Sequence, residues 1–395
     1  MGRLAALLVV VAAVAAPGVA RASPGMAVGA AEDSAKAPSL AIAKAKMDLA
    51  KLAGMDAIRL TAQWKTGKTA PTAGELAMLR NAVAAADLDG ITVYLSVYPF
   101  GSSVTPRTAA ARADFVTYAT ALAKALPTVR RFIVGNEPNL NRFWMPQFSN
   151  RGVDVAAPTY EAMLAQTYDA LKAVSPTITV IGGALSPRGN DSIMSRKHSP
   201  TTFLRDLGRA YRNSGRTKPI MDAFSLHPYQ DNSSIPPGFA HPRTTTISLA
   251  DYPKLVTLLG IAFDGTAQEG SDLPIVYDEF GVQSKIPSSK TSVYAGFAPR
   301  SDHPVSEAVQ GTYYAEALAM AACQPTVTAI LIFHVSDEPN LDRWQSGVFY
   351  ADDTPKSSLP VVQRAIRTLQ ASRTPNCTQA GIKAFAARSL AFVHR

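Results

Sequence analysis

The sequence has 395 residues, of which 47% are hydrophobic and 17% charged, and its formal net charge is +9. This length and composition allow a large buried core, in one big α/β domain or two ordinary ones, and exclude a disordered or fibrous protein. The basic residues are scattered, with no Lys/Arg-rich helix and no basic run interleaved with aromatic residues. A nucleic-acid partner is therefore not expected.

Residues 1–22 have the pattern of an export signal. Arg3 precedes an apolar run over residues 4–16, and residues 20–22 (Ala-Arg-Ala) have the small-x-small form of a signal-peptidase site. The run is shorter than the ~18–20 apolar residues that cross a bilayer, and no other stretch approaches that length. We therefore expect a secreted or extracytoplasmic protein whose mature form has no membrane-spanning segment.

From Met26 onward, predicted strands alternate with predicted helices. Short apolar runs rich in β-branched residues predict strands at 26–30, 57–61, 91–97, 131–134, 178–182, 223–226, within 273–281, and at 329–333. Helical periodicity and cap signals predict helices at 39–53, 73–86, 108–126, 160–174, 203–211, 252–259, 305–322 and 358–369.

Eight strand–helix units with nearly continuous apolar strands indicate a parallel sheet covered by helices, and eight units close a (β/α)8 TIM barrel. The competing fold is a doubly wound open sheet, which usually has fewer strands. No Gly-x-Gly-x-x-Gly follows the first strand to support it. We predict one barrel domain over residues 23–371 and a tail over residues 372–395. Long loops after the fourth to seventh strands favour a functional rim there.

Cys323 and Cys377 are the only cysteines in the chain. In an exported protein an even pair favours a disulfide bond. That bond would tether the tail to the end of the helix expected over residues 305–322.

Two predicted strands deliver a glutamate at the point where they end. Residues 131–134 lead into Gly-Asn-Glu-Pro at 135–138, and the segment 273–281 carries Glu279 just before a terminal Gly-containing turn. The strands of a closed parallel barrel all point their carboxyl ends at one rim, so residues at strand ends converge. The rim is expected to collect these polar side chains: Arg59, Asn136, Glu137, His227, Tyr229, Glu279 and His334.

This pattern resembles the large clan of retaining glycoside hydrolases built on (β/α)8 barrels, which includes cellulase-like and β-xylosidase-like families. The resemblance rests on residues 135–138 and Glu279. It is supported by Arg59, by His-Pro-Tyr at 227–229 and by the segment 344–356, and it spans nearly the whole mature chain. It implies an exported retaining β-glycoside hydrolase that cleaves O-glycosidic bonds of a polysaccharide or oligosaccharide by double displacement, with no metal or organic cofactor.

The resemblance also implies roles for five side chains. Retention requires one carboxylic acid that protonates the leaving oxygen and one carboxylate that attacks the anomeric carbon, ~5–5.5 Å apart. Glu137 is the implied acid/base and Glu279 the implied nucleophile. Arg59 and Tyr229 would favour the charged form of the nucleophile by charge and by hydrogen bonding. Asn136 would hold the sugar 2-hydroxyl.

Two histidines and three tryptophans complete the expected substrate site. His227 would orient the neighbouring tyrosine or contact the sugar. His334 stands where the clan usually places a tryptophan as a sugar platform. Trp64, Trp144 and Trp344 all follow strands, where a flat indole face can stack on a sugar ring.

Structural roles compete with these functional ones. Either glutamate could form a rim salt bridge, Arg59 could pair with a buried carboxylate, His227 could be a core histidine, and each tryptophan could pack in the core. A second Glu-Pro-Asn-Leu at residues 338–341 nearly repeats residues 137–140. It is expected in a loop, as a substrate contact or a loop cap rather than as the acid.

Alternative functions remain open from the sequence. One is a catalytically silent carbohydrate-binding or cell-surface barrel, and another is a transglycosylase on the same scaffold. A metalloenzyme using Glu137, Glu279, His227 and His334 is a third, but no His-x-x-x-His or comparable ligand spacing favours it. We expect a carbohydrate substrate and a monomeric protein, since no dedicated dimerisation helix is evident.

Overall fold

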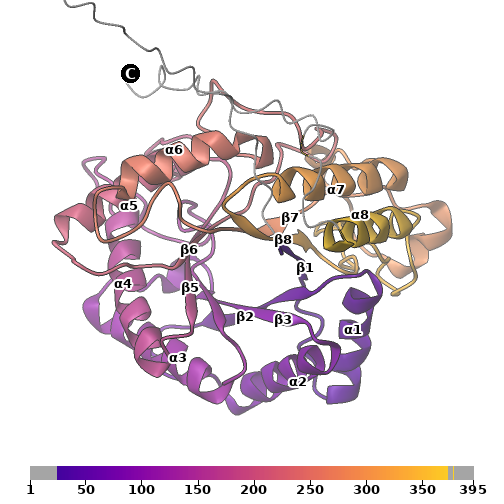
Figure 1. Cartoon of the computed structure of the whole chain (residues 1–395), viewed down its shortest axis with the longest axis horizontal. Helices are drawn as coiled ribbons and strands as arrows, with labels where there is room; N and C mark the ends of the chain where they lie inside the picture. Colours follow the sequence, from indigo (N-terminus) through magenta and orange to yellow (C-terminus); the bar gives the residue numbers. More distant parts are fainter. Residues whose placement is uncertain (1–24, 372–376, 378–395) are drawn as a thin grey trace, which may run out of the picture.

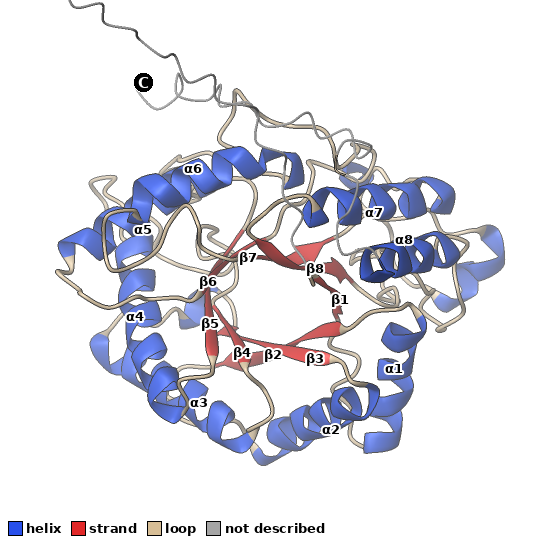
Figure 2. Cartoon of the chain, in the orientation of Figure 1, coloured by secondary structure: helices blue, strands red, loops and turns tan. Residues whose placement is uncertain are grey.

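The computed structural model describes residues 25–371 and 377. Its strands form a closed barrel in the order β1 to β8, every neighbouring pair is parallel, and β1 pairs with β8 to close the sheet (Figure 1). The strands lie at the centre and the helices form a ring around them (Figure 2). The predicted (β/α)8 barrel is confirmed and the open doubly wound sheet is excluded. The expected signal peptide (1–22), and the tail (372–395) apart from Cys377, lie outside the described residues.

Helices α1 to α7 each return the chain from the end of one strand to the start of the next, and α8 follows β8. The strands are β1 Ala27–Ala31, β2 Ala57–Trp64, β3 Thr92–Pro99, β4 Arg131–Val134, β5 Thr179–Leu185, β6 Ala223–Leu226, β7 Ile275–Phe280 and β8 Val327–Phe333. The α-helices are α1 Leu40–Leu52, α2 Ala73–Asp89, α3 Ala109–Ala125, α4 Ala156–Val174, α5 Pro200–Asn213, α6 Tyr252–Phe263, α7 Glu307–Ala322 and, after β8, α8 Leu359–Ala371. Short 3-10 helices are η1 Ser102–Val104, η2 Leu249–Asp251, η3 Ser288–Val293 and η4 Arg300–Asp302.

Hydroxyl side chains fix the starts of most helices. The side-chain oxygen of the residue before α1, α2, α3, α5 and α7 accepts a hydrogen bond from a backbone N–H in the first turn. These residues are Ser39, Thr72, Thr108, Ser199 and Ser306. Helix α4 begins earlier than the predicted start at Tyr160. Asp154 accepts hydrogen bonds from the amides of Ala156 and Ala157, and a proline is tolerated in a first helical turn.

The buried core has two parts. The larger part lies between the strands and the helix ring, and it holds large side chains such as Trp64, Phe115, Phe132, Tyr160 and Phe203. The smaller part fills the inside of the barrel with Ala57, Tyr94, Ile133, Ile181, Ala184, Ala223, Val276, Ala329 and Leu331. Because apolar side chains plug the interior, the barrel is not a pore, and a site can form only where this packing ends.

The predicted disulfide bond is present between Cys323, which follows α7, and Cys377. It holds the one described residue of the tail against the barrel. Among the described residues, no helix is both long enough and apolar enough to cross a membrane.

Candidate active site

A polar layer lies directly above the apolar plug of the barrel, toward the carboxyl ends of the strands. Successive side chains of a strand alternate between faces, so residues two positions apart share a face. On four strands an interior-facing apolar residue is followed, two positions later, by a buried polar residue. The apolar residues are Ala57, Tyr94, Ala223 and Val276. The polar residues are Arg59 on β2, Ser96 on β3, Ser225 on β6 and Asp278 on β7.

Glu279 reaches the same end of the barrel through an irregularity in β7. Strict alternation would place it and Asp278 on opposite faces of the sheet. The register between β7 and β8 shifts between Tyr277 and Phe280, which locally breaks the alternation. Such irregularities bend a strand and re-aim side chains, and here the Glu279 carboxylate turns toward the interior polar layer.

The end of β4 presents Glu137 through an unusual backbone. Gly135 has φ +103°, and a Cβ there would lie 2.8 Å from Cε2 of Tyr160, so this position needs glycine. Glu137 itself has φ +40°, in the left-handed region that side chains rarely adopt. Its amide donates a 2.8 Å hydrogen bond to the carbonyl of Ala184, which ties the turn to β5. Backbone strain of this kind concentrates at functional sites.

Arg59 is the hub of the polar layer. Its Nη1 donates to Oε1 of Glu279. Its Nη2 donates to Oδ1 of Asn136 at 3.0 Å and to Oγ of Ser96 at 3.2 Å. Its Nε lies 3.4 Å from Oδ2 of Asp278. The guanidinium thus links strands β2, β3 and β7 and the turn after β4.

His227 lies behind both rim glutamates and is fully buried. Its Nδ1 is 3.1 Å from Oε1 of Glu137 and 3.5 Å from Oε2 of Glu279. On the other side of the ring, Nε2 is 3.3 Å from Oδ1 of Asp278, which also accepts a hydrogen bond from the hydroxyl of Ser225. One imidazole therefore contacts three carboxylates.

The two glutamates differ in their other partners. Glu279 accepts from Arg59 and also receives a 3.1 Å hydrogen bond from the hydroxyl of Tyr229. Glu137 has only the His227 contact among the interactions of its carboxylate with described residues. The side chains of Glu137 and Glu279 keep exposed fractions of 15% and 13%, so both remain accessible to a ligand.

Burial and charge together set the protonation states of this layer. Burial alone would lower the pKa of His227, but Glu279 and Asp278 outweigh it and raise that pKa to about 10. Burial alone would raise the pKa of Asp278, but His227 and Arg59 outweigh it and hold that pKa below its ordinary value. Burial, followed by Glu279, raises the pKa of Tyr229 well above its ordinary value. Near neutral pH the layer therefore holds a cationic His227, an ionised Asp278 and a neutral Tyr229 that donates.

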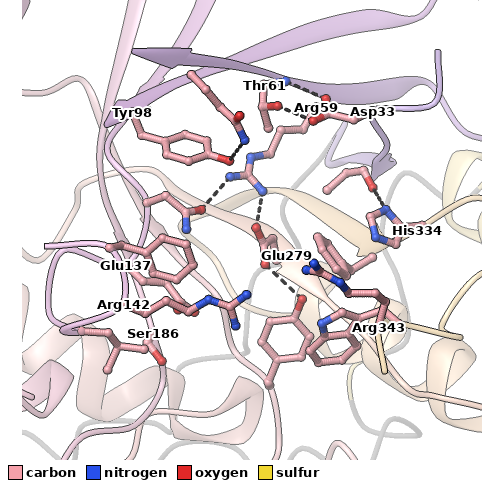
Figure 3. A pocket seen from close by; sticks show the side chains of 18 of the residues that line it. Asp33, Arg59, Thr61, Tyr98, Glu137, Arg142, Ser186, Glu279, His334 and Arg343 are labelled. Atoms are coloured by element: carbon pink, nitrogen blue, oxygen red, sulfur yellow. Dashed lines mark hydrogen bonds and ion pairs between the residues drawn. The ribbon is translucent and has the colours of Figure 1, made fainter. Parts of the chain in front are cut away.

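A cavity of about 740 Å³ opens over this layer at the carboxyl rim. Its volume lies within the ~300–1,000 Å³ typical of small-molecule sites. Figure 3 shows Glu279 near its centre, between Arg59 and a tyrosine hydroxyl. Seven of the residues expected at the site line the cavity: Arg59, Asn136, Glu137, Tyr229, Glu279, His334 and Trp344. His227 lies beneath the carboxylates rather than in the lining.

The expectation for two tryptophans is corrected by the structure. Trp64 is fully buried against Phe115, and its indole N–H donates to the carbonyl of Lys68. Trp144 is buried against Tyr160 in the same layer between strands and helices. Neither indole face is available to stack on a sugar, because Trp64, the last residue of β2, packs against Phe115 of α3, and Trp144, in the loop after β4, packs against Tyr160 of α4. Only Trp344 lies at the cavity.

The second Glu-Pro-Asn-Leu sequence lies in the loop after β8, as expected. Glu338 Oε2 accepts a 3.0 Å hydrogen bond from the amide of Trp344, which caps this loop. The same oxygen is 3.7 Å from Nε2 of His334, whose Nδ1 is 2.8 Å from the carbonyl of Ala31. Although burial alone would lower the pKa of His334, Glu338 and Glu32 raise it to about 9. His334 is thus a charged wall of the cavity rather than a flat apolar platform.

The structure also adds residues that the sequence reasoning missed. Asp278 is the buried partner of Arg59 and His227, and its signal was an acidic residue inside an apolar strand. The cavity lining further includes Gln63, Tyr98, Arg142, Arg188 and Arg343, which come from strand ends and rim loops. Within residues 25–371 and 377, no group of three or more His, Cys, Asp or Glu side chains is arranged to hold a metal ion.

Comparison with known proteins shows similarity in fold but not in sequence. No protein-family model matches the chain, and no curated protein matches it in sequence. Solved structures do match. A glucosidase from Croceicoccus marinus superposes with a TM-score of 0.58 at 13% identity, over 88% of this chain and 68% of that one. A monomeric β-xylosidase from Caulobacter crescentus gives 0.53 at 16% identity, over 87% and 69%.

A third similar structure is a GH2 β-galacturonidase from Eisenbergiella tayi bound to galacturonate. It gives a TM-score of 0.51 at 12% identity, over 88% of this chain and 52% of that one. The chain thus spans about half the length of this first match and about two thirds of the other two. At these identities the likeness establishes a shared barrel fold.

Proposed function

We propose that this chain is a retaining β-glycoside hydrolase, with Glu279 as nucleophile and Glu137 as acid/base. The observation that carries the proposal is the pair of strand-end glutamates in one cavity, held in different environments. Glu279 accepts hydrogen bonds from the cationic Arg59 and from Tyr229, which hold its carboxylate in place in the cavity. Glu137 contacts His227 but neither Arg59 nor Tyr229 by a hydrogen bond, so the two carboxylates have different partners. The barrel neighbours that are glycosidases support the same class of reaction.

The two carboxylates lie close together, each with an oxygen beside Nδ1 of His227. Because His227 Nδ1 is 3.1 Å from one oxygen of Glu137 and 3.5 Å from one of Glu279, those oxygens are no farther apart than the sum of these distances. That limit is reached only if the three atoms are collinear. Retaining enzymes place their carboxyl groups ~5–5.5 Å apart and inverting enzymes ~6.5–9.5 Å apart. This limit, which applies to one oxygen of each carboxylate, is compatible with the retaining spacing.

In the first step, Glu279 attacks the anomeric carbon as Glu137 donates its proton to the leaving glycosidic oxygen. The C–O bond to the leaving group breaks and an ester to Glu279 forms. Glu279 loses its negative charge in this ester while Glu137 becomes a carboxylate. His227 Nδ1 lies within reach of both groups, so its positive charge faces the carboxylate before and after the step.

In the second step, Glu137 accepts a proton from water, and the resulting hydroxide equivalent attacks the anomeric carbon and releases Glu279. Two inversions give net retention. Asn136 accepts from Arg59 through Oδ1, which leaves its amide nitrogen to donate to the sugar 2-hydroxyl. That hydrogen bond strengthens as positive charge develops on the ring. Trp344 and His334 form walls of the sugar site.

The setting follows from the sequence pattern of residues 1–22 and the disulfide. We propose export, cleavage of the signal segment, and action as a monomer on an oligosaccharide or polysaccharide outside the cytoplasm. The mechanism uses only side chains of this chain and calls for no metal or organic cofactor.

The test is a screen of the purified mature protein on aryl β-glycosides and soluble β-glycans, beside Glu137→Gln and Glu279→Gln. Activity that disappears in the Glu279→Gln variant and falls in the Glu137→Gln variant, with a product of retained configuration by NMR, supports the proposal. A product of inverted configuration contradicts retention. Glycan binding without cleavage by the native protein would favour the catalytically silent barrel.

A further inference from the structure

Two guanidinium groups enter the catalytic cavity from opposite sides. Arg142 comes from the loop after β4 and Arg343 from the loop after β8, and both point toward the centre, where Glu279 lies (Figure 3). Among the described residues, no carboxylate lies within ion-pair distance of Arg142. The nearest one to Arg343 is Asp342, its exposed neighbour in sequence, at 3.9 Å. Both arginine side chains are exposed, so they can meet a ligand.

The acidic side chains beside the glutamate pair are already engaged with the protein. Asp33 pairs with Lys36 at 3.0 Å and accepts a 2.9 Å hydrogen bond from the amide of Thr61. Glu32 accepts from the amides of Ser34, Val335 and Ser336. Glu338 caps the loop at Trp344.

The other cations of the cavity are engaged as well. Arg59 is bound to Glu279 and Asn136, and Arg188 donates to the carbonyl of Gln230 at 2.6 Å. Arg142 lies over the Phe143 ring, and Arg343 interacts electrostatically with Glu338, but in the described part of the chain neither guanidinium is held by an ion pair with a carboxylate beyond its sequence neighbour. Their positive charge is therefore available to a ligand.

We propose that the substrate is an anionic glycan, whose carboxylate or sulfate groups are bound by Arg142 and Arg343. This inference rests on the proposed glycosidase function and names its substrate class. A guanidinium presents a planar fork of N–H donors that matches a carboxylate or sulfate through paired hydrogen bonds. The loops after β4 and β8 flank Glu137 and Glu279, so the acidic groups belong to the sugar units next to the cleaved bond.

A second pocket extends this site along the rim. It has a volume of about 340 Å³, and Gln63 lines both it and the catalytic cavity. Three lysines line it: Lys36, which is paired with Asp33, and Lys65 and Lys68 from the loop after β2. Its acidic residue, Glu75, accepts a 2.7 Å hydrogen bond from the hydroxyl of Tyr118. The polymer therefore continues from the cavity past Gln63 to two further cations.

Binding is measured with matched polymers in a Glu137→Gln background, which removes the acid/base and keeps the polymers intact. One pair is a soluble polyuronate and the same polymer with its carboxylates reduced to alcohols. The other pair is a sulfated glycan and its desulfated form. Isothermal titration calorimetry gives the dissociation constants. Comparing the two pairs of polymers shows whether binding requires a carboxylate or a sulfate.

The double variant Arg142→Gln/Arg343→Gln is compared with the double variant Arg364→Gln/Arg367→Gln. The latter removes the same charge from exposed positions on α8, away from the cavity. We expect one anionic polymer to bind at least tenfold more tightly than its neutral partner. The cavity variant should lose roughly tenfold in affinity for that polymer, because its hydrogen bonds to the anionic groups are lost. Its affinity for the neutral polymer should change little. The α8 variant should bind as the background does.

Equal binding of the anionic and neutral partners, or equal losses in the cavity and α8 variants, would overturn the inference while leaving the glycosidase proposal standing. Selective binding of the anionic polymer with no cleavage by the native protein would support the anionic site and refute the hydrolase. Lys65→Gln/Lys68→Gln tests the extension. It should weaken binding of long anionic chains and leave a disaccharide unaffected, and an equal effect on both lengths contradicts the extension.

Discussion

The guanidinium of Arg59 on β2 contacts the carboxylate of Glu279 on β7, although the two residues are 220 positions apart in sequence. Arg59 is also 3.4 Å from Asp278, so a single buried cation faces two adjacent carboxylates. The carboxylates of Glu279 and Asp278, after the opposing effect of burial, raise the pKa of Arg59 above its ordinary value. In the proposed mechanism, Arg59 therefore stays charged while Glu279 loses and regains its negative charge.

Replacing Glu279 by alanine should abolish hydrolysis and leave the fold intact, since Arg59 keeps its contact with Asp278. Loss of the attacking carboxylate should cost several orders of magnitude in kcat. Added azide can then enter the vacated space and attack directly, giving a glycosyl azide of inverted configuration. NMR of the product and a far-UV circular dichroism spectrum check both parts. Native-level hydrolysis by this variant would refute the nucleophile assignment.

Replacing Glu137 by alanine should have an effect that depends on the leaving group. An aryl glycoside with a good leaving group needs little protonation, so its first step should be nearly unaffected. Substrates with poor leaving groups should lose ~10²–10⁴-fold in kcat/KM. The measurement is a series of aryl glycosides spanning a range of phenol pKa values. The same loss across the whole series would contradict the acid role.

Tyr229→Phe should lower activity with little effect on stability. The hydroxyl donates 3.1 Å to Glu279, and one lost hydrogen bond to a charged group costs roughly 1.5–3 kcal/mol. This corresponds to roughly a 10–100-fold fall in kcat/KM if the bond matters fully in the transition state. Tyr211→Phe is the matched control. Tyr211 is on α5, and its hydroxyl donates to the backbone carbonyl of Lys218. Comparable kinetic losses in the two variants would show that the effect is structural.

The sequence was sufficient for the barrel and for the residues that end its strands. Apolar runs of about the right length predicted every strand, because both faces of a parallel sheet are buried. Convergence of strand ends then brought Arg59, Glu137, Tyr229 and Glu279 into one expected site, and the structure places all four at one cavity. The disulfide followed from the only two cysteines.

Loop conformation was not predictable in the same way. Trp64 was expected in a loop, but β2 extends to include it, and Trp144 does follow β4; tertiary packing buries both side chains in the core. The carboxylate of Glu279 points toward the barrel interior because the register of β7 shifts against β8. No local sequence pattern in β7 predicts this shift. Arg142 and Arg343 carry no motif, and only the path of their loops brings them to the cavity.

Breaking the disulfide should lower stability without changing the site. Cys323 and Cys377 enclose a sequence separation of 54 residues, and a loop of this length is worth roughly 4 kcal/mol in the chain-entropy model. Cys323→Ser/Cys377→Ser should therefore unfold at a lower temperature, with kcat/KM unchanged at room temperature. Calorimetry with and without reductant checks this. A reductant effect of the same size in the double variant would show that the shift has another origin.

The contribution of His227 to stability should depend on pH in a defined direction. Its pKa in the folded protein is raised to about 10 because Glu279 and Asp278 outweigh burial, whereas an unfolded chain has a value of about 6.5. The folded state thus binds the proton more tightly. The stabilisation is fully present below about pH 6.5 and is lost as the pH rises through about 10.

Comparison with His227→Gln isolates this contribution, because other groups titrate in both proteins. Near neutral pH the variant should be less stable by roughly 3–5 kcal/mol, since Asp278 loses a buried partner. The difference in unfolding free energy should shrink steadily as the pH rises above about 6.5, where unfolded His227 loses its proton, and level off above about pH 10, where native His227 loses it too. Denaturant unfolding across this range measures it, and an NMR titration of the imidazole in the native protein reports the same proton directly. An imidazole that titrates near its ordinary pKa of about 6.5 would contradict a cationic His227 at the centre of the site.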